Sequence, residues 1–303
     1  MPTVTIPATS ANLGPGFDAF GLALDLRNRF SAELADAWVV EVAGEGEGRL
    51  PGGADNRVAR SMARVFAEAG RPGLAAHVRC ENRIPPGAGL GSSAAAIVGG
   101  LMLGDALSDA ALDRQAILRL AAELEGHPDN VAAALHGGFT ICWEDDGPHC
   151  VRIEPAGGLA AVIVAANSPL ATGASRALLP GSVPHADAAF SAGRAGLLVT
   201  GIALGDTAAL AAGLTDRIHE PYRVAAVADL EDVRSLLVTA GAAGAVLSGA
   251  GPTVIGLVHG PDDTGALLAA EAVAERVRVE ASALKGRCEP RVLGISRTGA
   301  SFD

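Results

Sequence analysis

Apolar and polar positions follow two different periods along the chain. Between residues 55 and 69 the apolar residues recur at helical spacing and Gly70 ends the run, which predicts a helix. Between residues 74 and 80 apolar residues alternate with polar or small ones, which predicts a half-buried strand. The run at residues 159–165 is apolar throughout and short, which indicates a buried strand. Strands and helices therefore alternate, and we expect a mixed α and β fold.

Further elements follow the same two patterns. Short strands at residues 3–7 and 20–26 flank a glycine-rich turn, and Ser108 is expected to cap a helix that runs to Glu125. We place a domain boundary near residue 155, after the polar stretch 144–149, which gives domains 1–155 and 156–303. The other predicted elements are helices at 92–103, from 128, within 186–212, at 229–240 and at 266–277, and strands at 139–143, 245–248, up to 258 and at 291–296.

The charge composition excludes several functions. The chain has 303 residues, of which 23 are basic and 34 acidic, so the net charge is −11. Lys285 is the only lysine, and it follows no glycine loop, so a Walker-type phosphate loop is absent and Schiff-base chemistry would depend on that one residue. An acidic chain without a basic run is not expected to bind nucleic acid.

Nothing in the sequence predicts a membrane or an oxidising location. Residues 1–7 lack the charged start and apolar core of a signal peptide, and no run reaches the roughly 20 apolar residues that span a bilayer. The four cysteines (Cys80, Cys142, Cys150, Cys288) form no Cys-x-x-Cys pair, so we expect buried thiols rather than a zinc or redox site. We therefore expect a cytoplasmic protein with no membrane partner.

The strongest chemical signal is the glycine-rich run at residues 84–95, Ile-Pro-Pro-Gly-Ala-Gly-Leu-Gly-Ser-Ser-Ala-Ala. Its glycines let backbone N–H groups approach an anion at the start of the helix predicted from residue 92, which describes a phosphate cradle that needs no lysine. A dinucleotide fingerprint fits less well, because Ser92 takes the place of the third glycine. A serine-hydrolase elbow fails because Ala95 replaces its last glycine. A plain tight loop that caps a helix is the remaining alternative.

Two more glycine turns, at residues 7–18 and 247–253, accompany this run, and either one alone could be a structural turn. Together, the three resemble the motifs of the GHMP kinases, a superfamily of small-molecule kinases. The resemblance covers the chain from Pro7 onward. It implies an α+β fold with an N-terminal domain like the second domain of ribosomal protein S5 and a ferredoxin-like C-terminal domain, with the active site between them.

Within the superfamily, four segments resemble the homoserine kinases: residues 9–18, 125–132, 172–176 and 220–223. The Arg-x-x-x-Glu-His stretch of galactokinases and the first-motif lysine of mevalonate kinases are absent. The resemblance implies ATP-dependent phosphorylation of the L-homoserine hydroxyl to O-phospho-L-homoserine, a step of threonine biosynthesis, and a homodimer. A GHMP kinase that acts on another small alcohol, or a catalytically silent member that binds a ligand, are the alternatives.

The same resemblance implies the roles of individual residues. Asp18 and Asp129, assisted by Asn12, would bind the substrate ammonium, Arg176 and Arg223 its carboxylate, and Asn130 its hydroxyl. Asp129 and Asn130 are the catalytic candidates, and whether Asp129 acts as a base is left open. The implied ATP-binding residues are Pro86, Gly87, Ala88, Gly89, Leu90, Gly91, Ser92, Ser93, Ala94 and Ala95.

The resemblance also implies a magnesium site and draws attention to one histidine. Mg²⁺ would be held by Ser93 and Glu123, with Glu125 as an alternative to Glu123. His127 has the chemistry of a general base, but its neighbours Gly126 and Pro128 favour a turn histidine.

Overall fold

The short apolar run that the sequence places near residue 160 forms β7 (Leu159–Val164), and all six of its residues are buried. Because side chains alternate along a strand, the two faces of β7 enter two different hydrophobic cores. Leu159, Ala161 and Ile163 belong to one core, and Ala160, Val162 and Val164 to the other. The computed structural model describes residues 1–165, 175–224, 227, 229–280 and 289–303.

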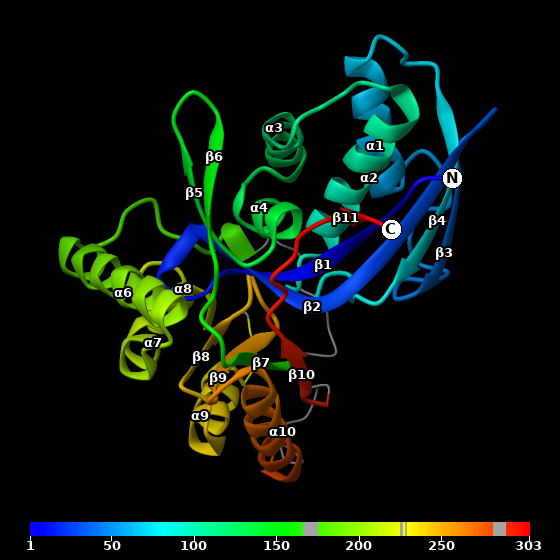
Figure 1. Cartoon of the computed structure of the whole chain (residues 1–303). Helices are drawn as coiled ribbons and strands as arrows, with labels where there is room; N and C mark the ends of the chain where they lie inside the picture. The colour runs from blue at the N-terminus through cyan, green and yellow to red at the C-terminus, as the bar shows by residue number, and fades with distance from the viewer. Residues whose placement is uncertain (166–174, 225–226, 228, 281–288) are drawn as a thin grey trace.

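The first sheet has the strand order β11-β1-β2-β4-β3, with β5 paired to β2 and β6 paired to β5 (Figure 1). All pairs are antiparallel except β3 with β4. The strands are β1 (Thr3–Asn12), β2 (Gly16–Ala35), β3 (Val39–Gly44), β4 (Ala75–Asn82), β5 (Phe139–Glu144), β6 (Pro148–Ile153) and β11 (Ser301–Phe302).

Four helices lie together on one side of this sheet (Figure 1): α1 (Arg57–Glu68), α2 (Ser92–Ser108), α3 (Arg114–Glu125) and α4 (Asp129–His136). Helix α1 begins where Asn56 Oδ1 accepts the Val58 N–H at 3.0 Å, and it buries one face that includes Met62 and Phe66. Helix α2 is apolar on nearly all sides because it lies inside the first core, between the sheet and α1.

The second sheet has the order β10-β7-β9-β8 and is antiparallel throughout. Its other strands are β8 (Gly244–Leu247), β9 (Val254–His259) and β10 (Arg291–Gly294). Counted along the chain, the spatial order is fourth, first, third, second, which is the ferredoxin-like arrangement. The remaining helices are α6 (His185–Leu204), α7 (Thr207–Gly213), α8 (Glu220–Arg223), α9 (Leu230–Ala240) and α10 (Asp263–Glu280). Helices α9 and α10 pack on one face of this sheet, so the expected ferredoxin-like half is confirmed.

Several predicted boundaries are wrong. The two short N-terminal strands are parts of one long hairpin, because β1 and β2 stay paired from Thr3 to Asn12 through two irregularities in register. Ser108 ends α2 instead of capping the next helix, and Asp109 follows it with a left-handed φ of 52°. The true cap is Asp113, whose Oδ1 accepts the Ala116 N–H at 2.7 Å.

Three strands, β3, β6 and β11, have no counterpart in the predicted elements. Strand β6 begins within the polar stretch and pairs with β5, with its polar residues on an exposed hairpin. Strand β11 returns from the second half of the chain and pairs with β1 at Val4 and Thr5. The predicted boundary near residue 155 falls between β6 and β7, which lie in different sheets, but residues 301–302 belong to the first sheet.

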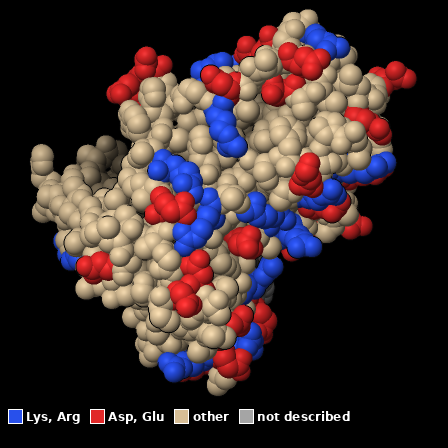
Figure 2. Space-filling view, viewed as in Figure 1, with Lys and Arg blue, Asp and Glu red and all other residues tan. Residues whose placement is uncertain are grey.

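Charged side chains of both signs are interspersed over the face seen in Figure 2, while the lobe formed by α6 and α7 carries few of them. Helix α6 has only one acidic and one arginine residue, Asp187 and Arg194, among its 20 residues. Among the helices of the described ranges, none combines the length and the apolar character that crossing a membrane requires.

Candidate active site

The glycine-rich run forms a loop that ends at the start of α2, and two hydrogen bonds hold it in place. The Thr9 N–H donates to Leu90 O at 3.1 Å, and Ser248 Oγ donates to Gly89 O at 2.6 Å. Gly89 and Gly91 have φ of 78° and 69°, and a Cβ on Gly91 would collide with Thr9 Oγ1. Only glycine satisfies both conditions, so the backbone can pass between β1 and the turn at residues 248–251.

The first turn of α2 is open to an anion. The residue before the helix is Gly91, and no side chain caps the first N–H groups. Unpaired N–H groups and the helix dipole favour negative charge at this end of a helix of 17 residues. Ser92 and Ser93, the first two helical residues, line a pocket of about 90 Å³. The loop therefore has the geometry of a phosphate cradle.

The predicted nucleotide-binding residues divide into two groups. Gly87, Gly89, Gly91, Ser92 and Ser93 line the pocket. The apolar members of the run are buried beneath them and support the loop: Ala88, Leu90, Ala94 and Ala95.

A second cavity, of about 370 Å³, adjoins the first and shares Gly87, Ser92 and Ser93 with it. Its walls combine apolar and amide side chains with the charged side chains of Asp55, Arg57 and Arg60, and the apolar part of the lining suits a flat heterocycle. They include Asn28, Phe30, Leu50, Pro51, Asn56, Val58, Asn82, Pro86 and Ala96. The cavity could not be predicted from sequence, because its residues come from segments that are far apart along the chain.

All six predicted substrate residues line the first pocket: Asn12, Asp18, Asp129, Asn130, Arg176 and Arg223. Arg176 Nη1 and Nη2 each donate to a different carboxylate oxygen of Asp18 at 2.7 Å. Arg223 differs, because its side chain is only 2% exposed and no carboxylate of the described chain lies within 4 Å of it. Residues 172–174 of the predicted substrate segment lie outside the described residues.

Arg223 carries a buried positive charge that forms no ion pair with the described residues. Burial lowers the pKa of its guanidinium and the nearby charge of Arg176 lowers it further, while the more distant charges of Asp18, Glu220 and Asp216 act in the opposite direction. Its Nε has no hydrogen-bond partner within the described part of the chain, and its Nη1 donates to Gly249 O at 3.2 Å. Because an unpaired buried charge is costly, the site favours an anion next to Arg223.

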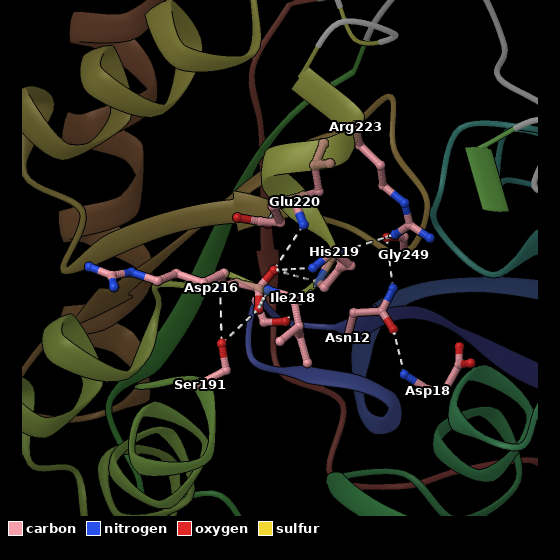
Figure 3. A network of polar contacts seen from close by, with 12 residues as sticks. Asn12, Asp18, Ser191, Asp216, Ile218, His219, Glu220, Arg223 and Gly249 are labelled. Atoms are coloured by element: carbon pink, nitrogen blue, oxygen red, sulfur yellow. Dashed lines mark hydrogen bonds and ion pairs between the residues drawn. The ribbon is translucent and has the colours of Figure 1, made fainter. Parts of the chain in front are cut away.

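The side chain of Asn12 stabilises the loop that leads to Asp18, and both of its polar atoms are already hydrogen-bonded. Its Nδ2 donates to Gly249 O at 2.8 Å, and its Oδ1 accepts the Asp18 N–H at 2.9 Å. Asn12, at the end of β1, is thereby joined to the turn after β8, and it fixes the backbone that carries Asp18 (Figure 3). Asn12 and Asp18 both have positive φ, at 67° and 56°.

His127, Asp129 and Asn130 form a polar cluster at the start of α4. His127 Nδ1 lies 2.6 Å from Asp129 Oδ1, which also accepts the Asn130 N–H at 2.6 Å. Burial opposes the charged form of His127, but the hydrogen bond and the charge of Asp129 outweigh it, and its pKa is raised. Asn130 Oδ1 accepts the hydroxyl of Thr9 at 2.7 Å. His127 lies in a bend of the chain, which fits a turn histidine, but it also lines the pocket.

The structure does not bring Glu123 to the pocket. Glu123 lies on the outer side of α3, where it pairs with Arg64 at 3.0 Å and Arg119 at 2.8 Å. Glu125 lines the pocket instead, and Ser93 Oγ donates to its Oε2. The geometry therefore favours the alternative, Glu125, as the carboxylate that accompanies Ser93.

Arg57 is a residue that sequence reasoning missed. Its Nη1 donates to Ser93 Oγ at 2.7 Å and lies 3.2 Å from Glu125 Oε2.

Within the described ranges no group of three or more His, Cys, Asp or Glu residues could hold a metal ion. Magnesium commonly uses one or two carboxylates together with substrate phosphates and water, so the oxygens of Ser93 and Glu125 fit it.

Comparisons with known proteins identify the family of the chain. The GHMP kinases N terminal domain model matches residues 56–138, and the GHMP kinases C terminal model matches residues 198–279. The homoserine kinase of Clavibacter michiganensis subsp. michiganensis is 44% identical over 278 residues, which cover 90% of this chain and 87% of that protein. The homoserine kinase of Streptomyces coelicolor is also 44% identical, with coverages of 84% and 83%.

A solved structure supports the same family. The crystal structure of homoserine kinase from Cytophaga hutchinsonii superposes with a TM-score of 0.86 at 28% identity, over 100% of this chain and 97% of that one. The fold and the family models thus define a small-molecule kinase, and its glycine-rich loop ends at an uncapped helix N-terminus. The chain belongs to the GHMP kinases and, among them, to the homoserine kinase family. The expected two-domain α+β fold is confirmed.

Proposed function

We propose that this protein transfers the γ-phosphoryl group of ATP to the hydroxyl of L-homoserine and forms O-phospho-L-homoserine, a precursor in threonine biosynthesis. The observation that carries the substrate assignment is Arg223, a buried guanidinium with no carboxylate partner among the described residues, in the same pocket as Asp18 and the start of α2. An amino acid with a side-chain hydroxyl supplies the missing carboxylate and an ammonium group for Asp18. Relatives of this chain that carry the name homoserine kinase support the choice.

The two cavities divide the nucleotide between them. Backbone N–H groups of residues 87–93 and the start of α2 bind the phosphates, and the cavity of about 370 Å³ takes the adenosine. Because Gly87, Ser92 and Ser93 line both cavities, a nucleotide that fills the larger one extends its phosphates toward the smaller one.

The substrate groups follow from the charges around the pocket. The carboxylate lies against Arg223 and Arg176, and the ammonium lies against Asp18 and Asp129. Asn130 has its Oδ1 occupied by Thr9, and its Nδ2, which donates one hydrogen to Asp129 Oδ1 at 3.4 Å, has a second hydrogen to donate to the substrate hydroxyl oxygen. These contacts hold the hydroxyl for an in-line approach, and positioning provides much of the rate in phosphoryl transfer.

Asp129 is better suited to binding than to removing a proton. Its Oδ1 already contacts His127 Nδ1 and accepts the Asn130 N–H, each at 2.6 Å, which leaves Oδ2 to contact the substrate ammonium. We assign Asp129 to the substrate ammonium and to the orientation of Asn130.

Ser93 and Glu125 hold the metal in this proposal. When bound, Mg²⁺ neutralises charge on the phosphate oxygens. Arg57 must leave the Ser93 hydroxyl and the Glu125 carboxylate when the metal binds them, because it contacts both.

An ADP-release assay with homoserine, mevalonate and shikimate, each with and without Mg²⁺, tests the assignment. We expect turnover that depends on homoserine and Mg²⁺, and an Arg223→Ala variant with a homoserine KM raised about 10- to 100-fold at similar ATP KM. Turnover of another alcohol in preference to homoserine contradicts the proposal, and no turnover of any alcohol favours a silent, ligand-binding role. The cytoplasmic location and the homodimer implied by the family stay predictions, which fractionation and sedimentation would test.

A further inference from the structure

A buried imidazole joins the two segments that recognise the substrate. His219 is 0% exposed and precedes α8, which carries Arg223. Its Nε2 lies 2.7 Å from Gly14 O, in the loop between Asn12 and Asp18, and its Nδ1 lies 3.0 Å from Arg223 Nη1 (Figure 3). The ring of Phe17 stacks on the imidazole with centroids 5.2 Å apart.

These contacts determine the tautomer of His219. A backbone carbonyl only accepts, so Nε2 must carry the hydrogen that it donates to Gly14 O. A guanidinium only donates, so Nδ1 must be the acceptor for Arg223. The neutral imidazole with hydrogen on Nε2 satisfies both contacts, whereas the protonated ring would turn an N–H toward a guanidinium N–H. Burial lowers the pKa of His219 to about 4; Asp216 and Asp18 oppose the shift and Arg223 adds to it.

Asp216 fixes the backbone that carries His219. Its side chain is fully buried and accepts the N–H groups of Ile218 at 2.9 Å and of His219 and Glu220 at 2.8 Å. Ser191 Oγ donates to the same carboxylate at 3.2 Å. A four-residue helix has little stability of its own, so these bonds hold α8 in place. Asp216 also lies 3.6 Å from His219 Nε2.

We propose that His219 is a positioning residue, whose neutral imidazole aims the guanidinium of Arg223 at the substrate carboxylate and fixes the Asp18 loop through Gly14. The inference rests on the proposed function, because it takes the carboxylate of homoserine as the partner of Arg223. Among the described residues, Arg223 donates one other hydrogen bond, the longer one of 3.2 Å from Nη1 to Gly249 O. Without the Nδ1 acceptor, its long side chain gains rotational freedom inside a polar pocket, and substrate binding must then restrict it.

Two substitutions separate the two contacts of the ring. In His219→Asn the amide oxygen stands near the position of Nδ1 and still accepts from Arg223, but nothing reaches Gly14. In His219→Gln the amide nitrogen stands near Nε2 and donates to Gly14 O, but Arg223 loses its acceptor. We expect the homoserine KM to rise about 10- to 100-fold in His219→Gln and by less than about threefold in His219→Asn, with the ATP KM unchanged in both. His149→Gln, on the exposed β5–β6 hairpin, is the matched control and should leave all constants unchanged.

The decisive experiment is a double-mutant cycle between His219→Gln and Arg223→Ala, read as kcat/KM for homoserine, with thermal unfolding of every variant. If His219 acts through Arg223, the double variant is no worse than Arg223→Ala alone. If the two losses multiply, or if the Asn and Gln variants are equally impaired, the positioning role is wrong although the kinase assignment stands. If wild-type protein does not phosphorylate homoserine at all, the proposed function fails and this inference fails with it.

Discussion

Asp18 and Arg176 neutralise each other across the pocket, with two hydrogen bonds of 2.7 Å that join β2 to the second half of the chain. The proposed substrate carries the same two charges, a carboxylate and an ammonium. It can therefore replace the internal ion pair with contacts of its own, and a ligand with one charge cannot.

We predict that Arg176→Ala raises the homoserine KM about 10- to 100-fold with a small change in kcat, because it removes a charged contact made before and during transfer. Steady-state kinetics with saturating ATP measures this. The control is the charge-exchanged double variant Asp18→Arg/Arg176→Asp. It keeps an ion pair but inverts both substrate contacts, so a homoserine KM near that of wild type in this variant would refute the assignment.

The metal site should distinguish two glutamates on the same helix. We predict that Glu125→Gln abolishes Mg²⁺-dependent turnover and weakens Mn²⁺ binding measured by electron paramagnetic resonance, whereas Glu123→Gln changes neither. Glu125 contacts Ser93 in the pocket, and Glu123 pairs with Arg64 and Arg119 outside it. Arg57→Ala should strengthen Mn²⁺ binding without nucleotide, because it removes a cation from the same oxygens. Equal effects of the two glutamate variants would contradict the site.

Gly91 and Gly70 provide a matched pair for the nucleotide loop. Both have φ of 69°, but a Cβ meets Thr9 at Gly91 and no atom within 4 Å at Gly70. We predict that Gly70→Ala costs about 1 to 2 kcal/mol of unfolding free energy, the strain of the left-handed conformation alone, with normal kinetics. Gly91→Ala should cost more and raise the ATP KM. Chemical denaturation and ATP titration measure both, and a normal ATP KM in Gly91→Ala would count against the phosphate cradle.

Glu220 should make stability fall as the pH rises. Complete burial raises its pKa from 4.5 to about 7, although Arg234 and the Leu247 N–H act in the opposite direction. A folded pKa above the unfolded one means that the folded state holds the proton more tightly, so stability decreases between about pH 4.5 and about pH 7, by an amount of order 3 kcal/mol. We predict that Glu220→Gln flattens the Tm profile between about pH 5 and about pH 8. Glu231→Gln, at an exposed partner of the same Arg234, should leave the profile as it is; a flattened profile there too would assign the effect to Arg234.

His219 changes stability with pH in the opposite direction, over an overlapping range. Its pKa of about 4 lies below the ordinary value of 6.5, so the unfolded state binds the proton more tightly and stability decreases as the pH falls from about 6.5 toward about 4. The two buried groups are neighbours in the chain and favour opposite conditions.

The motifs predicted which residues line the pocket more accurately than the hydrophobic pattern predicted the bounds of the helices and strands. Gly87, Gly89 and Gly91 could be assigned to a loop from sequence because a glycine run has few other purposes at the start of a helix. The choice between Glu123 and Glu125 could not be made, since two residues of spacing decide which face of α3 a side chain occupies. His219 and Asp216 gave no signal because their importance lies in contacts with Gly14 and Arg223, which are distant in sequence.

One element that the sequence missed, β11, is held by long-range pairing. Strand β11 has two residues, Ser301 and Phe302, too few for any alternating pattern, and it exists because β1 offers an unpaired edge. Ser108 resembled a helix cap because serine is favoured there, but apolar packing carries α2 to this residue. Lys285 and Cys288, which the composition singled out, lie outside the described residues.

The return of β11 to β1 sets an order of events during synthesis. The Asp303 N–H donates to Thr3 O, and Asp303 also pairs with Arg29 at 2.7 Å, so the first strand of the protein is covered by residues about 300 positions later. The edge of β1 therefore stays open on the ribosome until the second sheet has been translated. A chain that stalls at any point before β11 therefore leaves that edge open to strands of other nascent chains.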